Sequence, residues 1–151
     1  MTLNNDIKKV EVFYDGRCGM CCTFHEWINK QERGSEIDFI PYQSSEASQI
    51  FPGIHELDPA RAMVVRTDDS EIYRAAEAWV WCLWSCKKHR KLARKLSHPR
   101  FLPIAETTCR VLAANRHSLS KVFFRSKDKR VAAKLHKMPK LECEGEHCAI
   151  S

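Results

Sequence analysis

The chain has 151 residues, of which 44% are hydrophobic and 29% are charged, values typical of one soluble globular domain. Its N-terminal stretch is polar and lacks the apolar segment of a secretory signal, and no apolar run is long enough to cross a bilayer. The sequence therefore excludes a transmembrane protein and predicts a cytoplasmic one. In that compartment, eight cysteines indicate metal binding, thiol catalysis or burial in place of a disulfide scaffold.

The net charge of +6 is distributed unevenly along the chain. Residues 87–140 contain 17 Lys and Arg against two acidic residues, whereas residues 1–86 contain 8 against 14. A basic surface attracts nucleic acid, anionic membranes or acidic partners, so a basic interaction module stays open as an alternative function. The stretch Lys87–Lys95 has no interleaved aromatic residues that would stack on bases, which disfavours nucleic acid as a partner.

The first predicted elements form a β-α-β unit. Residues 10–15 are rich in β-branched and aromatic side chains and precede a glycine, which indicates a strand. Apolar residues then recur at helical spacing over about 18–34, and a second strand is predicted over 37–42. A short helix follows, with Ser44 or Ser45 at its N-cap.

A hairpin and further helices complete the predicted core. Residues 61–75 read as two antiparallel strands around a polar turn, and one long helix is expected over about 76–96. Another helix is predicted over about 104–115, followed by a basic helix over about 121–136. This order predicts an α/β fold with a thioredoxin-like β-α-β-α-β-β-α core and additional C-terminal helices.

Cys18-Gly-Met-Cys21 directly follows the first predicted strand, at the start of a helix. Unpaired N–H groups and the partial positive charge at a helix N-terminus favour a thiolate, the reactive form of cysteine. Cys18 is therefore the candidate nucleophile and Cys21 the candidate resolving thiol, with Arg17 expected to favour the thiolate further. Asp15 completes the candidate catalytic set, either as a proton shuttle or by hydrogen-bonding the loop. Cys22 is expected to point elsewhere and to be structural.

Two other readings of the cysteine cluster stay open. One is burial of thiols that have no chemical role. The other is a metal-binding or metal-trafficking protein, since one Cys-x-x-Cys supplies only two of the four ligands of zinc. In that case Cys143, His147 and Cys148 of the C-terminal tail provide further ligands to Cys18 and Cys21.

Outside this cluster, most candidate side chains have structural interpretations. Cys82 and Cys86 lie one helical turn apart among apolar neighbours, which predicts burial in the core. The tryptophans of residues 79–84 cannot all face one way at helical spacing, so at least one is expected to be partly exposed. His25 is expected at the surface.

The segment FYDGRCGMC resembles the Tyr-Asp-Gly-x-Cys-x-x-Cys signature of the DCC family of predicted thiol–disulfide oxidoreductases, which matches Asp15, Cys18 and Cys21. IDFIPYQS, IYRAAEAW and FLPIAETTCRVLAANRHSLS are also similar to family segments, so the resemblance extends over about residues 10–120. It implies a thioredoxin-like fold and dithiol exchange with protein or small-molecule thiol and disulfide substrates, with no cofactor. We expect a redox domain over 1–120 and a basic helical extension with a cysteine-containing tail over 121–151.

Three features depart from the family pattern. Ala75 stands where the family tends to have glycine, and Cys22 adds a thiol to the motif. Pro59 lies too far ahead of the third predicted strand to match the proline loop that faces the cysteines in thioredoxins.

Overall fold

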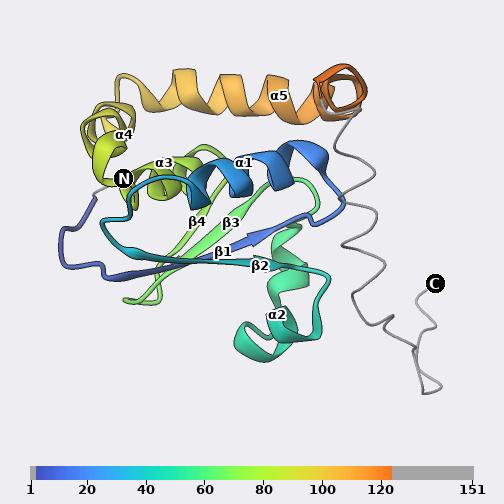
Figure 1. Cartoon of the computed structure of the whole chain (residues 1–151), viewed down its shortest axis with the longest axis horizontal. Helices are drawn as coiled ribbons and strands as arrows, with labels where there is room; N and C mark the ends of the chain where they lie inside the picture. Colours follow the sequence, from blue (N-terminus) through green and yellow to red (C-terminus); the bar gives the residue numbers. More distant parts are fainter. Residues whose placement is uncertain (1–2, 124–151) are drawn as a thin grey trace.

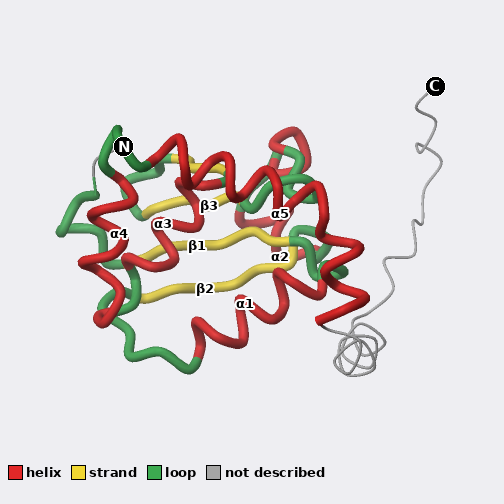
Figure 2. Tube along the Cα trace, turned by 90° about the horizontal axis from the view of Figure 1, so that it is seen from above, coloured by secondary structure: helices red, strands yellow, loops and turns green. Residues whose placement is uncertain are grey.

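A four-stranded mixed sheet forms the centre of the molecule, whose computed structural model describes residues 3–123. Its strand order is β2-β1-β3-β4, and Figure 2 shows the first three of these strands side by side. β1 runs parallel to β2 and antiparallel to β3, which in turn is antiparallel to β4. The strands are β1 (Lys9–Tyr14), β2 (Glu36–Pro41), β3 (Val64–Thr67) and β4 (Ile72–Arg74).

Helices cover both faces of this sheet (Figure 1). One face carries α1 (Gly19–Asn29) and α3 (Ala76–Trp84), and the other carries α2 (Ser45–Ile50). A further layer, made of α4 (Arg90–Ser97) and α5 (Leu102–Phe123), lies over α1 and α3. The β-α-β-α-β-β-α order and the sheet topology confirm the predicted thioredoxin-like α/β fold with additional C-terminal helices.

The core has two parts because successive residues of a strand point to opposite faces of a sheet. Val12 of β1 is fully buried in the larger cluster, together with Trp81 and Trp84 of α3. Phe13, the next residue, is fully buried in the smaller cluster beside Ala47 of α2 and Ile54. β1 is therefore an interior, buried strand, and its residues pack against core clusters on both faces of the sheet.

Several local predictions are confirmed in detail. Ser44 is the N-cap of α2, and its Oγ accepts a hydrogen bond from the backbone N–H of Ala47 at 3.2 Å. β3 and β4 form the expected antiparallel hairpin. The loop that follows α2 contains a short 3₁₀ helix, η1 (Ile54–Leu57).

The prediction of one long helix over 76–96 is wrong, because α3 ends at Trp84 and a 3₁₀ turn, η2 (Lys87–His89), precedes α4. Cys86 is extended, with φ −96° and ψ 121°, and forms an isolated β-bridge with Arg33. The Ser85 carbonyl accepts a hydrogen bond from the Gly34 N–H at 2.7 Å, and the Lys87 N–H donates to the Glu32 carbonyl at 3.0 Å. Hydrogen bonds to the loop after α1 thus replace the next helical turn.

α5 is longer than the helix predicted over 104–115 and continues through the expected division at residue 120. The basic helix predicted over 121–136 lies outside the described residues, apart from the end of α5, and so does the cysteine-containing tail. The division into two parts stays a prediction. Within residues 3–123, no helix combines the length and the apolar character that crossing a bilayer requires.

Candidate active site

The candidate site lies where β1 and β2 end at the same edge of the sheet. The two strands are parallel and in register, so Tyr14 is paired with Pro41. The loop that leads from β1 into α1 therefore lies beside the segment that follows β2. Carboxyl ends of adjacent parallel strands are a common place for binding sites in α/β folds.

A side chain from the segment after β2 holds the loop between β1 and α1. Gln43 Nε2 donates a hydrogen bond to Asp15 Oδ1 at 2.6 Å, and Gln43 Oε1 accepts one from the Gly16 N–H at 3.2 Å. Asp15 Oδ1 also accepts from the Arg17 N–H at 2.9 Å, and its backbone carbonyl accepts from the Cys18 N–H at 3.1 Å. Asp15 thus makes the loop hydrogen bonds that were one of its two predicted roles.

Cys18 is the N-cap residue of α1, with extended backbone angles, and only 9% of its surface is exposed. The pKa of Cys18 is lowered to about 6, and a hydrogen bond from the thiol of Cys21 is the largest cause. The backbone N–H groups of Met20 and Cys21 also lower it, although neither forms an N-cap hydrogen bond of normal geometry. Burial and the nearby Asp15 carboxylate oppose this shift. The Cys18 sulfur is therefore a partly shielded thiolate near neutral pH.

Cys21 has the opposite property, since its pKa is raised well above the ordinary value of a thiol. The largest cause is its hydrogen bond to Cys18, followed by burial. The two thiols are thus asymmetric: one is ionised and the other holds a proton. Because Cys18 is the largest cause, loss of the Cys18 thiolate would lower the pKa of Cys21.

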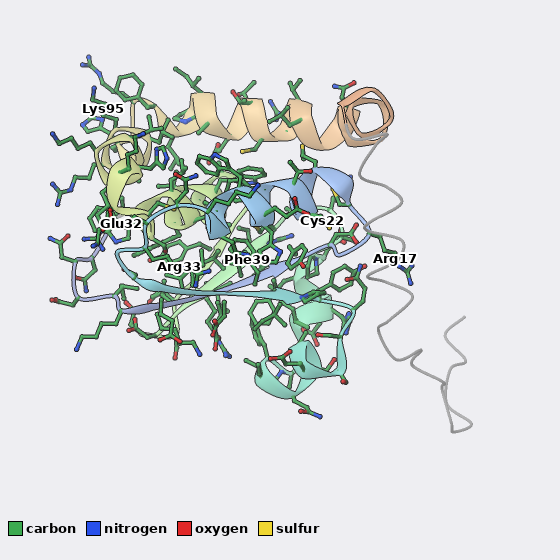
Figure 3. The ribbon with its side chains drawn as sticks, in the orientation of Figure 1. Arg17, Cys22, Glu32, Arg33, Phe39 and Lys95 are labelled. Carbon is green, nitrogen blue, oxygen red and sulfur yellow. The ribbon has the colours of Figure 1, made fainter. Side chains whose placement is uncertain are left out.

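Three neighbours of the pair differ from, or add to, the sequence-based expectations. Arg17 is exposed, and Figure 3 shows its side chain pointing away from the body of the molecule. The pKa of Cys18 is lowered by Cys21 and by the backbone at the start of α1, and not by Arg17 as expected. Cys22 is half-buried, and its Sγ donates to the Gly16 carbonyl at 3.4 Å, which fits the predicted structural role. His25 is not a free surface side chain, because its ring packs against that of Phe39, with 4.4 Å between the ring centroids.

A pocket of about 630 Å³ opens next to the two cysteines. One wall is the segment Pro59–Met63, which immediately precedes β3, and another is Trp79 of α3. α5 closes a third side with a face that includes Cys109 and Arg110. The segment before β3 therefore does face the cysteines, contrary to the sequence-based expectation, although the described residues contain no cis peptide bond.

The other cysteines and tryptophans behave largely as predicted. Cys82 and Cys86 are completely buried, and burial raises the pKa of both thiols, which confirms their assignment to the core. Trp81 and Trp84 are also buried, whereas Trp79 is half-buried at the pocket and confirms that one tryptophan is partly exposed.

The basic stretch after α3 is partly used within the fold. The guanidinium groups of Arg90 and Arg94 lie over the Trp84 ring, at 4.9 and 5.4 Å from its centroid. Lys87 forms an ion pair with Glu32 of the loop after α1. These cations support the α3–α4 junction, so only part of the charge counted from the sequence is available to partners.

The metal alternative depends on residues that lie outside the described chain. Over residues 3–123, no cluster of three or more His, Cys, Asp and Glu side chains has the arrangement of a metal site. The proposed additional ligands, Cys143, His147 and Cys148, belong to the tail that the structure does not describe.

Comparison with known proteins identifies one family. The model of the family described as DCC1-like thiol-disulfide oxidoreductase matches residues 12–122. No curated protein and no solved structure matches the chain. The matched segment begins in β1, contains the complete cysteine site and ends within α5. The chain therefore belongs to the DCC1-like thiol-disulfide oxidoreductase family.

Proposed function

We propose that this protein catalyses thiol–disulfide exchange with the Cys18/Cys21 dithiol, Cys18 acting as the nucleophile and Cys21 as the resolving thiol. The observation that carries the proposal is the position of Cys18 at the N-cap of α1, with Cys21 three residues further on and both lining one pocket, where the pKa of Cys18 is lowered to about 6 chiefly by Cys21. A thiolate at neutral pH is the species that attacks a disulfide.

In the direction of disulfide reduction, the Cys18 thiolate attacks one sulfur of the substrate R–S–S–R. A bond forms between Cys18 Sγ and that sulfur, the substrate S–S bond breaks, and one RS⁻ leaves. Cys21 then loses its proton to solvent or to the departing thiolate, and its sulfur attacks Cys18 Sγ. The products are the Cys18–Cys21 disulfide and a second RS⁻, so two electrons pass from the protein to the substrate.

The difference between the pKa values of Cys18 and Cys21 determines when Cys21 can attack the mixed disulfide. While Cys18 is a thiolate, its hydrogen bond with Cys21 keeps Cys21 protonated and unreactive. Once Cys18 is part of a mixed disulfide, this cause is gone and the pKa of Cys21 falls, although burial still opposes ionisation. The resolving thiol is therefore activated by the first step itself.

Asp15 has a positioning role in this proposal. Through Gln43 and the backbone of Arg17 and Cys18 it maintains the loop that presents the nucleophile. Its negative charge raises the pKa of both catalytic thiols, so its contribution is geometric and it acts against the thiolate electrostatically.

A redox titration of the full chain tests the proposal. The protein is equilibrated in buffers of defined thiol–disulfide potential, quenched with a thiol-blocking reagent, and analysed by peptide mass mapping. We expect one two-electron couple that pairs Cys18 with Cys21, and accumulation of mixed disulfides on Cys18 in the Cys21→Ser variant. Independent oxidation of the two cysteines, with no shared disulfide, would exclude this function.

A further inference from the structure

The pocket beside Cys18 differs in shape from an open surface that accepts another folded protein. Cys18 is 9% exposed, and residues of α5 line the same pocket as the dithiol. Its volume of about 630 Å³ lies in the range of pockets that enclose small molecules, roughly 300–1,000 Å³. Because so little of Cys18 is exposed, a small disulfide that enters the pocket reaches its sulfur more readily than a disulfide on the surface of a folded domain does.

The charge of the pocket points to the chemistry of what enters. Arg61 comes from the segment before β3 and Arg110 from α5, and both line the pocket together with the cysteines. Among the residues that the structure describes, neither guanidinium takes part in an ion pair. Glu106 is the acidic residue in the lining, and the Cys18 thiolate adds a second negative charge, so the two guanidinium groups are the cationic groups available to an anionic ligand. Guanidinium groups bind carboxylates through pairs of charge-assisted hydrogen bonds.

The remaining walls are apolar. Met20, Ala62, Met63 and Trp79 line the pocket together with the two arginines and the cysteines. An apolar lining with a few charged groups is the usual composition of a site that binds and orients a small molecule. The apolar part accommodates the carbon chain next to the sulfur, while the arginines hold charged ends away from the reacting atoms.

We propose that the substrate of this pocket is a low-molecular-weight disulfide that carries carboxylate groups, held by Arg61 and Arg110 while Cys18 attacks its sulfur. The inference rests on the proposed function, because it uses the same dithiol. The exchange is the one written above: the pocket's disulfide is reduced to two thiols and Cys18–Cys21 is oxidised, after which an external dithiol reductant regenerates the protein.

The test compares three small disulfides of different charge in single-turnover reactions with the pre-reduced full chain. Oxidised glutathione is anionic, bis(2-hydroxyethyl) disulfide is neutral, and cystamine is cationic. Each rate constant for oxidation of Cys18 and Cys21 is divided by the rate of the same disulfide with a small reference thiol, which removes differences in intrinsic reactivity. We expect the normalised rate to be at least about tenfold higher for oxidised glutathione than for the neutral compound, with cystamine lowest.

Variants assign this preference to the pocket. Arg61→Gln and Arg110→Gln should each lower the normalised rate with oxidised glutathione about fivefold, and leave the neutral disulfide within about twofold. Arg110→Glu should reverse the order of oxidised glutathione and cystamine. Lys95→Gln removes one positive charge, as the two Arg→Gln variants do, but Lys95 is exposed on α4 and does not line the pocket, so all three rates should be unchanged.

The outcomes separate this inference from the proposed function. Equal normalised rates for the three disulfides, or equal losses in every variant, would overturn the substrate class while leaving the dithiol chemistry in place. Faster normalised reduction of the disulfides of insulin than of oxidised glutathione would assign the pocket to a protein segment and would also overturn it. Failure of every disulfide to oxidise Cys18 would instead contradict the proposed function.

Discussion

Gln43 and Asp15, which are 28 residues apart in sequence, are joined by a hydrogen bond of 2.6 Å between the amide Nε2 and the carboxylate Oδ1. The amide oxygen of the same side chain accepts from the Gly16 N–H, so Gln43 uses both ends on one loop. This pairing is possible because β1 and β2 are parallel and end in register. Gln43 therefore connects the segment after β2 to the loop between β1 and α1 that precedes Cys18.

Removing this connection should destabilise the protein. We expect Gln43→Ala to lower the free energy of unfolding by about 1–2 kcal/mol, because it leaves the Asp15 carboxylate and the Gly16 N–H without these partners. Gln43→Glu should cost more at pH 7, since two carboxylates then face each other. Urea denaturation measures both effects. Gln49→Ala, at an exposed position of α2, is the matched control, and equal losses at the two positions would contradict the role of Gln43.

The reactivity of Cys18 should follow its lowered pKa. We expect its alkylation by iodoacetamide to rise with a midpoint near pH 6, because only the thiolate reacts. In Cys21→Ala the midpoint should move upward toward that of an ordinary thiol, since the Cys21 hydrogen bond is the largest cause of the shift. Cys21→Ser retains a hydroxyl donor and should move it less. Cys109, whose pKa is raised by burial, serves as the internal reference, and equal labelling of Cys18 and Cys109 at pH 7 would rule out an activated Cys18.

The same shift makes stability depend on pH. The pKa of Cys18 is lower in the folded protein, at about 6, than the ordinary thiol value of 9.0 expected after unfolding. Its ionisation therefore stabilises the fold fully above about pH 9, and this contribution is lost as pH falls toward 6. We expect the stability of the reduced wild type relative to Cys18→Ser to increase between pH 6 and 9. Urea denaturation with a phosphine reductant measures it, and a constant difference over this range would be inconsistent with the lowered pKa.

Replacing Ala75 by glycine should stabilise the protein. Ala75 precedes α3 with φ 50° and ψ −118°, a conformation that favours glycine and strains a residue with a Cβ atom. Relief of this strain should raise the free energy of unfolding by about 1 kcal/mol. Ala76→Gly, one residue later in ordinary helical conformation, should instead lower it by up to about 1 kcal/mol. Thermal unfolding of the two variants compares them directly, and destabilisation by Ala75→Gly would refute the prediction.

The elements that could be predicted from sequence are those whose signals are local. The β-α-β start, the Ser44 cap and the β3–β4 hairpin each depend on residues close together in the chain, and all are present. The proximity of Cys18 to Cys21 is also local, because Cys21 lies three residues after Cys18 at the start of a helix. Position 75 is identified differently, through the family resemblance, which places a glycine there, and the positive φ of Ala75 agrees with it.

The parts that could not be predicted depend on contacts between distant segments. Gln43 reaches Asp15 only through strand register, and the segment Pro59–Met63 reaches the cysteines only through the position of β3. The face of α5 that includes Arg110 reaches the pocket by folding back over α1 and α3. The sequence pattern within any one of these segments does not indicate which other segments it contacts in the folded protein.

The end of α3 is the clearest example of a feature that depends on contacts between distant segments, and substitutions of Arg90 test it. Arg90 Nε donates to the Trp84 carbonyl at 3.1 Å, and Nη2 donates to the Gly34 carbonyl at 3.0 Å and to Ser35 Oγ at 3.2 Å. Its guanidinium thus joins the last turn of α3 to the loop after α1. We expect Arg90→Ala to lower the free energy of unfolding by about 2 kcal/mol, and Arg90→Lys to recover little, because an ammonium cannot reproduce the planar fork.

A double-mutant cycle with Gly34 isolates this connection. A Cβ atom on Gly34 would lie 2.8 Å from Arg90 Nη2, so Gly34→Ala should push the guanidinium away from its three acceptors. In the wild type this substitution should therefore destabilise the protein, whereas in the Arg90→Ala background most of its cost should disappear. Lys91→Ala, at an exposed position of α4, provides the background control and should leave the full cost of Gly34→Ala. Urea denaturation of the four variants of the cycle gives the coupling energy. Additive effects of Gly34→Ala and Arg90→Ala would show that Arg90 does not hold the α1–β2 loop against the end of α3.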